Sequence, residues 1–597
     1  MEFLIKKSKL IVSFSRVLLT AAALLIALAA CSNPSGDDGK AFFTINLGSS
    51  GRMAWGPSNS VSSFPAYSDL KYELTFTSTI NQNTETFEGN LSSGTITGSI
   101  DIGEYTVSLK IFLEADGTPY ASDDGQHGSV EINANTPISM NMVKDPDLGE
   151  DGSAAHPFRV YDLDTLRRVG KGSNAAWTGN WSLSAHYSQM RDITLPDVEP
   201  GEFNNWTPIG EGTPFAGSYD GNNKTISNLT QGFFQNINSG AIVQNVGIID
   251  CDINGGYWSG SVVGTNEGTV KNCYATGEIR GQTNDSSVGG VVGFNNGMVQ
   301  NCHFMGEVSG VGILGGVVGN NRIMAATVQD CYATGKVRET TIDNSTVGGV
   351  VGFNCGTVVN CYSTSDLEGS INVGGVVGSI GTEGISPGTV QNCYSTGEVT
   401  GTNNVGGVVG NNDGGTVENC YATGEVSGTQ YVGGVAGNSG GTVENCYATG
   451  NVSGTGHSVG GVAGNSGGTV ENCYATGEVS GSSYVGGVVG GNSSGSVQNC
   501  IALNPKISGS DNWRVAPVGT VTNNYGREDM LPGGSGGWTN SAGEDGADIT
   551  PEHWQTPHWW TDNALFNEGV WTIVSNKLPT LKGVPNEADQ TPSVQSN

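Results

Sequence analysis

The sequence is poor in positive charge. It has 25 Lys and Arg residues against 56 Asp and Glu residues, a formal net charge of −31 over 597 residues. Nucleic-acid binding depends on clustered Lys and Arg side chains that neutralise phosphates. The balance therefore predicts that nucleic acid is not a partner. Because charged residues make up only 14% of the chain, the acidic excess is most simply explained by solubility.

The sequence also lacks the motifs of common catalytic sites. Its seven His residues include no His-Glu-x-x-His pair, which a zinc peptidase would need. His553 and His558 are separated by Pro557, and we expect them to pack among nearby tryptophans. Residues 533–537 read as a glycine loop rather than a nucleophile turn, and no phosphate-binding loop is present. These absences predict a protein that is not an enzyme and holds no cofactor or metal ion.

Long apolar runs are missing after the first thirty residues. A basic segment precedes the apolar run Val17 to Ala30, which has the length of a signal-peptide core rather than of a membrane span. Leu28-Ala29-Ala30-Cys31 resembles a bacterial lipobox. We therefore predict a lipoprotein signal peptide over residues 1–30, a lipid on Cys31, a flexible tether over residues 31–40, and an exported protein anchored to the outer membrane or cell surface.

What the sequence has in quantity is a repeat of about 27 residues. A Cys marks it at positions 273, 302, 331, 361, 393, 420, 446, 473 and 500. One copy contains three short Val-rich runs, Val432–Ala436, Thr442–Ala448 and Gly450–Val452, and none is long enough for a helix. The fold class is therefore predicted as all-β, with a right-handed parallel β-helix over residues 241–505. Each strand should pair with its equivalent about 4.8 Å away in the next coil.

The alternation within one block predicts which side chains face the core. The inward positions are Val435, Val443, Cys446, Ala448 and Val452, and the outward positions are Glu444, Tyr447 and Thr449. Asn445 is expected at a bend, with its amide bonded to the equivalent Asn of a neighbouring coil, in the stack that contains Asn419, Asn472 and Asn499. The glycines at the corners are expected to supply the positive φ of tight turns.

The cysteines are numerous for a chain that we expect to lack disulfides. Twelve cysteines in an exported protein would ordinarily indicate pairing. Nine of them, however, occupy one inward position of the repeat, and none has the spacing of a zinc site. Cys251 and Cys355 fall out of register. We predict a ladder of buried free thiols, with partial pairing as the alternative.

The repeat resembles the GLUG-motif family, named for Gly-Leu-hydrophobic-Gly. Here Val replaces Leu, as in Gly290-Val291-Val292-Gly293 and Gly434-Val435-Ala436-Gly437, and the segment Trp206 to Gly210 looks like the first coils of that family. The resemblance covers residues 155–502 and implies a β-helix. The family includes adhesin-like surface proteins, uncharacterised lipoproteins and non-catalytic parts of zinc peptidases that cleave immunoglobulin A. No residue here matches the peptidase motif.

The remaining sequence divides into flanking domains. Residues 41–145 contain alternating strands with turn signals, which predict an immunoglobulin-like or transthyretin-like β-sandwich acting as a stalk. Residues 155–240 are expected to form an N-terminal cap and the first coils. The Trp-rich residues 506–585 are expected to cap the other end, and residues 586–597 to be disordered.

The possible ligand surface is a file of outward tyrosines. It comprises Tyr274, Tyr332, Tyr362, Tyr394, Tyr421, Tyr447 and Tyr474, with His303 in one coil. Exposed aromatic side chains of this kind bind sugars or protein partners, although stacking alone also explains them. We expect an adhesin-like surface protein that binds a host or matrix protein or a glycan.

Two alternatives remain. The first is a polysaccharide lyase or hydrolase, with Asp250 and Asp252, or the Glu files 418/444/471 and 398/425/478, as its carboxylates. We consider these groups poor candidates, because Asp250 and Asp252 lack basic partners nearby in sequence and the Glu files repeat in every coil. The second alternative is a purely structural envelope protein.

Overall fold

The computed structural model describes two compact units, Met1–Gly149 and Glu150–Asn597. The described residues are 40–46, 70–91, 95–101, 103–113, 119–123, 130–132, 136–139, 142–144, 150–173, 179–341, 344–381, 387–517, 519–532, 538, 543–585 and 587–595. The predicted signal peptide, the lipidation site Cys31 and most of the tether lie outside these residues. None of the helices in the described ranges has the length and apolar character needed to cross a membrane.

The first unit consists of two small sheets that share one core. One sheet has the strand order β4 (Thr95–Asp101), β1 (Lys40–Asn46), β8 (Thr136–Ser139). The other contains β3 (Thr84–Asn90), β2 (Leu70–Ser78), β5 (Gly103–Leu113), β6 (Pro119–Asp123) and β9 (Met142–Lys144), with β7 (Val130–Ile132) paired to β5. Phe43 of β1 and Phe76 of β2 are both buried, and their rings lie 4.7 Å apart. This contact joins the two sheets.

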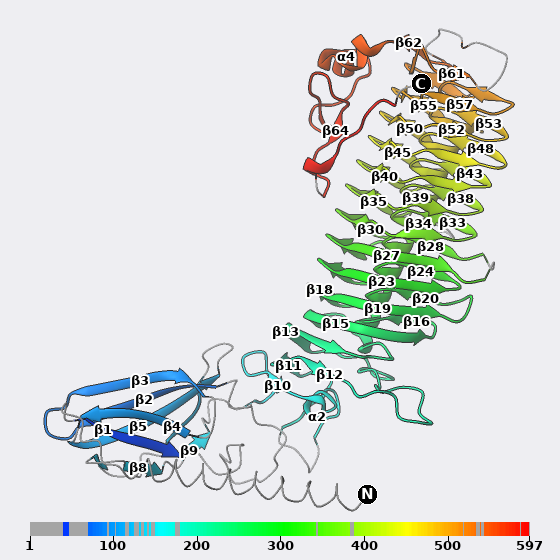
Figure 1. Cartoon of the computed structure of the whole chain (residues 1–597). Coiled ribbons are helices and arrows are strands. Elements are labelled where there is room, and N and C mark those ends of the chain that lie inside the picture. Colours follow the sequence, from blue (N-terminus) through cyan, green and yellow to red (C-terminus); the bar gives the residue numbers. More distant parts are fainter. Residues whose placement is uncertain are drawn as a thin grey trace, which may run out of the picture. The chain divides into compact units, whose positions relative to one another are not determined.

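The second unit is a parallel β-solenoid (Figure 1). A 33-stranded sheet runs from β10 (Phe158–Val160) to β62 (Ala547–Ile549), and two 10-stranded sheets run from β14 (Phe234–Ile237) to β54 (Val489–Asn492) and from β16 (Trp258–Gly260) to β58 (Asn512–Trp513). Equivalent residues pair in register, for example Val443 with Val470. The parallel solenoid predicted from the period is confirmed.

One coil shows how the sequence is distributed over the three sheets. In it, β43 (Gln430–Gly433) and β44 (Ala436–Ser439) belong to the two shorter sheets, whereas β45 (Thr442–Glu444), β46 (Tyr447–Ala448) and β47 (Val452–Gly454) are pieces of the long sheet. The predicted strand Val432–Ala436 is therefore wrong, because it contains a corner between two sheets. The other two predicted runs lie in one sheet.

The glycines at this corner have a different role from the one predicted. Neither Gly433 nor Gly434 has a positive φ. A Cβ on Gly433 would lie 2.0 Å from the oxygen of Ala436, and one on Gly434 would lie 2.1 Å from the oxygen of Gly461. Close backbone approach thus requires glycine at this corner.

The left-handed conformation occurs instead at the asparagine bend. Asn445 has φ 51°, and equivalent residues from Asn245 to Asn523 share this conformation. The predicted amide ladder holds in several coils, since Asn419 donates to Asn392 over 3.2 Å. At Asn445 it is wrong, because that amide donates to the Glu444 carboxylate. The left-handed conformation itself is tolerated at this bend because the Asn side chain is short and polar.

The core contains the predicted residues and one polar ladder that was not predicted. Val435, Val443, Cys446, Ala448 and Val452 are all at most 2% exposed. At the C-terminal ends of successive strands in the β14–β54 sheet, fully buried Asn side chains form hydrogen bonds with one another from coil to coil. The ladder runs Asn266 to Asn295 (2.6 Å), Asn295 to Asn321 (2.7 Å) and Asn321 to Asn354 (2.7 Å).

The thiol ladder leads to a prediction about reactivity. All nine repeat cysteines, together with Cys251 and Cys355, are buried, and none of these eleven forms a disulfide. Burial raises the pKa of Cys446, which disfavours the reactive thiolate. We expect native protein to leave these thiols unmodified by an aromatic disulfide reagent, and denatured, unreduced protein to react at most of them. Denatured protein with almost no free thiol would show that the cysteines pair.

Candidate functional site

The predicted tyrosine file forms a continuous stack on the outer face of the long sheet. Consecutive rings from Tyr332 to Tyr474 lie 4.8 to 4.9 Å apart, with planes within 5° of parallel. Strand register imposes this spacing, since each Tyr pairs with the Tyr of the next coil. Each ring face between two coils is therefore covered by a neighbouring ring, the outer face of Tyr274 lies against Gly247, and Tyr474 is fully buried. Sugar stacking needs a free aromatic face, so only the ring edges and hydroxyls of this file remain for a ligand.

Four of the seven tyrosines in the file are not accessible. Tyr394 and Tyr421 are each 4% exposed, Tyr447 is 1% exposed and Tyr474 is 0% exposed. This corrects the expectation of seven exposed tyrosines. Tyr274, Tyr332 and Tyr362 remain partly exposed, and burial raises the pKa of Tyr362 to about 12, with smaller contributions from Tyr394 and Tyr332.

The buried tyrosines are covered by the C-terminal strap, which we define as residues 550–585 and 587–595. Figure 1 shows this segment, with α4 (Pro557–Asp562) and β64 (Thr580–Leu581), returning along the side of the solenoid. Tyr474 donates a hydrogen bond to the oxygen of Pro579 over 2.6 Å, and Tyr447 donates to Gln590 over 2.9 Å. The aromatic residues of the strap form one buried cluster with these tyrosines.

The strap corrects two sequence predictions. The long sheet continues as far as β62, so only part of 506–585 lies beyond the solenoid strands, and that part covers a side of the solenoid. Residues 587–595 were predicted to be disordered, but Gln590 is buried and bonded to both Leu581 and Tyr447. His553 packs against Trp559 as expected, at 6.0 Å, whereas His558 is exposed.

His303 gives the stack a pH dependence. Its ring lies 5.2 Å from Tyr274 and 4.5 Å from Tyr332, and burial lowers its pKa below the ordinary 6.5. The unfolded chain therefore takes up this proton at a higher pH than the folded chain. The contribution of His303 to stability is thus lost as the pH falls through 6.5 and then through the lowered pKa.

We expect the urea midpoints of the wild type and His303→Tyr to diverge as the pH falls from 7.5 to 5.5. The wild type should lose more stability, because Tyr does not titrate in this range. Parallel pH profiles for the two proteins would contradict this assignment.

The carboxylates considered for catalysis are engaged in surface pairing. Asp252 and Glu278 both form ion pairs with Arg280. Arg280 lies one coil beyond Asp252, so the expectation that Asp252 has no basic partner is wrong. Asp250 is exposed. In the Glu file, burial and then the neighbouring Glu418 and Glu471 raise the pKa of Glu444. Among the described residues, no group of three His, Cys, Asp or Glu side chains could hold a metal ion.

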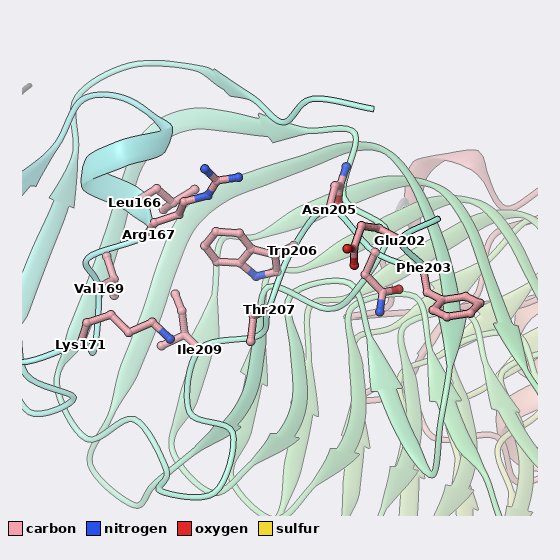
Figure 2. A pocket seen from close by; sticks show the side chains of 11 residues that line it. Leu166, Arg167, Val169, Lys171, Glu202, Phe203, Asn205, Trp206, Thr207 and Ile209 are labelled. Carbon is pink, nitrogen blue, oxygen red and sulfur yellow. The ribbon is translucent and has the colours of Figure 1, made fainter. Parts of the chain in front are cut away.

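The first coils contain a groove that the sequence did not reveal. We call it the cap groove: about 490 Å³ in volume, between the end of α2 (Leu163–Leu166) and the loop 202–209. Figure 2 shows Arg167 and Lys171 on one side, Glu202 and Phe203 on the other, and Trp206 between them. Its lining residues are Leu166, Arg167, Val169, Lys171, Glu202, Phe203, Asn204, Asn205, Trp206, Thr207 and Ile209.

The loop that forms one wall of the cap groove is held firmly. Asn205 donates to the oxygen of Pro196 over 2.8 Å and accepts a bond from the Thr230 hydroxyl over 3.0 Å. Trp206 is 7% exposed and donates its indole N–H to the oxygen of Phe233 over 3.1 Å. By contrast, Phe203 is 90% exposed. The groove thus has a fixed floor and an exposed aromatic rim.

A second groove, the Tyr257 groove, lies along the following coils. Its volume is about 450 Å³. Tyr257 is 62% exposed and Trp258 is 44% exposed, and the Trp258 ring lies 5.2 Å from Phe294 at a tilt of 40°. The groove is also lined by polar side chains, among them Glu211, Gln231, Gln235, Asn236 and Ser259. Aromatic faces beside amides and a carboxylate are the groups that bind sugar rings and hydroxyls.

The sequence did contain a signal for the Tyr257 groove. Trp258 pairs with Ser287, which in turn pairs with Ile313, so an aromatic residue here departs from the repeat. A departure from a repeat marks a unique place on an otherwise uniform surface. The cap groove has no such signal, because its walls come from segments outside the period.

Comparisons with known proteins agree with the repeat architecture. The GLUG motif matches four segments, residues 401–427, 428–453, 455–480 and 481–508, which confirms the resemblance. Halomucin of Haloquadratum walsbyi is 30% identical over 218 residues, 34% of this chain and 2% of halomucin. The chain therefore spans a very small part of that protein. A solved structure of IgA1 Protease covers 78% of this chain and 29% of its own, at 14% identity and a TM-score of 0.27, which carries no implication for activity.

Proposed function

We propose that this protein is an exported, lipid-anchored binding protein of the outer membrane or cell surface, adhesin-like, and that it binds glycans through the grooves of its first coils. The observation that carries this proposal is the Tyr257 groove, where two exposed aromatic side chains lie beside five polar ones. The similarity to halomucin supports a surface location.

The location of the ligand site differs from the sequence-based hypothesis. The tyrosine file has its ring faces covered by stacking and four of its seven tyrosines covered by the strap. Tyr257 and Trp258 satisfy the requirement for free aromatic faces better. Host or matrix proteins remain candidate partners through the same exposed residues.

A glycan and matrix-protein array probed with the full chain tests the proposal. We expect binding to saccharides. The double variant Tyr257→Ala with Trp258→Ala should bind about tenfold more weakly, because each exposed aromatic face contributes about 1 kcal/mol or more by stacking on a sugar ring. Tyr484→Ala, which removes a 50% exposed aromatic elsewhere, is the control. Binding that survives the double variant would place the site elsewhere.

The alternative functions have distinct outcomes in the same experiments. A polysaccharide lyase or hydrolase would depolymerise a glycan and lose that activity in Asp250→Asn with Asp252→Asn. We expect no depolymerisation. A purely structural envelope protein would bind nothing on the array.

Anchoring through Cys31 is tested separately. We expect labelled palmitate to enter the wild-type protein in a bacterial host and to be absent from Cys31→Ala, because the lipid is carried by this thiol. Equal labelling of both proteins would refute lipidation at Cys31.

A further inference from the structure

The cap groove carries two cations that form no ion pair with a described residue. Arg167 and Lys171 are exposed and line the groove, and neither side chain forms an ion pair with a described residue. Four arginines elsewhere are instead neutralised by carboxylates, in the pairs Arg280–Asp252, Arg338–Glu307, Arg514–Asp548 and Arg527–Asp529. Two unpaired cations on one wall form a site for an anionic group.

The net charge of −31 does not prevent an anion from binding here. At physiological ionic strength, charges more than about 8 Å apart in solvent are largely screened. An anion in the groove therefore interacts chiefly with the charges that line it, which are Arg167 and Lys171 on one wall and Glu202 on the other. Among the residues that line the groove, Glu202 is the one acidic side chain.

The opposite wall restricts the chemistry of the ligand. Figure 2 places Glu202 and Phe203 across the groove from the two cations. A carboxylate repels a second anion but accepts hydrogen bonds from hydroxyl groups. Phe203 adds an exposed aromatic surface. The ligand that satisfies both walls has a carboxylate on one side and hydroxyls on a ring on the other, which describes an acidic sugar.

The two grooves adjoin each other through one segment. Residues 202–209 form a wall of the cap groove, and Glu211 and Gly212 line the Tyr257 groove. Asn204 of the first groove accepts a hydrogen bond over 2.8 Å from Gln231, which lines the second. The two grooves are therefore neighbours on the first coils.

We propose that the cap groove binds a uronic-acid-bearing oligosaccharide, with the sugar carboxylate at Arg167 and Lys171. This inference rests on the proposed glycan-binding function and assigns the acidic class of its ligand. The Tyr257 groove then holds the adjoining sugar units.

Calorimetric titration of the full chain with trigalacturonate tests the inference. We expect binding that weakens about tenfold in Arg167→Gln with Lys171→Gln, and weakens similarly for the methyl-esterified trisaccharide, because both changes remove the charge-assisted bonds. Lys336→Gln with Lys506→Gln removes equal charge elsewhere and should change the dissociation constant less than about twofold. Binding of trigalacturonate should also weaken with added salt.

Four results would overturn the inference. Equal affinity for the acid and its methyl ester, with loss only in the Tyr257 and Trp258 variant, would leave glycan binding intact and refute the acidic subsite. An equal loss of trigalacturonate affinity in the two double charge variants would show that the ligand responds to the overall charge of the protein rather than to the cap groove. Poly-glutamate that binds as tightly as trigalacturonate at Arg167 and Lys171 would indicate an acidic protein partner instead. An absence of saccharide binding altogether would refute both this inference and the proposed function.

Discussion

Replacing Trp571 by alanine is expected to detach the C-terminal strap from the tyrosine stack. Trp571 is fully buried, and its ring lies 4.7 Å from Phe566 and 5.9 Å from Tyr474. Removal of so large a buried side chain costs about 3–5 kcal/mol. The cluster around Trp571 is the core that holds the strap against the solenoid. We therefore expect the lost stability to appear as local opening of residues 550–595 while the solenoid remains folded.

Limited proteolysis with mass spectrometry measures this opening directly. We expect early cleavage within the strap in Trp571→Ala and a solenoid fragment that resists the protease. Phe203→Ala, which removes a side chain that is 90% exposed, should behave as the wild type. Simultaneous digestion of strap and solenoid would show instead that the two unfold as one unit.

The second large effect is expected at the buried asparagine ladder. Asn295 is fully buried, accepts a hydrogen bond from Asn266 over 2.6 Å and donates one to Asn321 over 2.7 Å. Its carbonyl oxygen also accepts the N–H of Gly297. Asn295→Ala leaves these groups without a partner and should cost about 3 kcal/mol, since each buried unsatisfied polar group costs about 1–3 kcal/mol.

A surface ladder provides the matched control. Asn438 donates to Asn411 and accepts from Asn465, also in a stack, but it is partly exposed. Water replaces its lost bonds, so Asn438→Ala should cost at most about 1 kcal/mol. The comparison is made by urea denaturation followed by circular dichroism. Equal costs at the two positions would mean that burial does not determine the strength of the ladder.

Sequence periodicity predicted the solenoid because the chain repeats one environment many times. The inward residue Val443 alternates with the outward residues Thr442 and Glu444 within β45, and this alternation is visible without a structure. The corner at Gly433 and Gly434 was not visible, because Val on either side makes an apolar run that reads as one strand. The position of the corner depends on backbone contacts between coils, and the local sequence does not show these contacts.

The candidate sites were predicted less well for a related reason. The tyrosine file was identified, but its burial depends on the strap, whose aromatic residues have no period to indicate where they pack. The Asn266 ladder was missed because a polar residue in a strand is ordinarily assigned to the surface. The cap groove joins α2 to a loop about forty residues away, and no local pattern predicts that they meet.

The position of the strap bears on how the length of this molecule can change. The strap forms hydrogen bonds with coils of the C-terminal part of the solenoid, among them those of Tyr447, Tyr474 and Tyr525. A coil duplicated between the grooves and Tyr394 would stack on nearly identical neighbours and leave both ends undisturbed. Recombination between repeats of about 27 residues would then move the first coils away from the strap in steps of about 4.8 Å. The architecture thus allows reach to vary among related chains while the binding grooves and the closing segment stay the same.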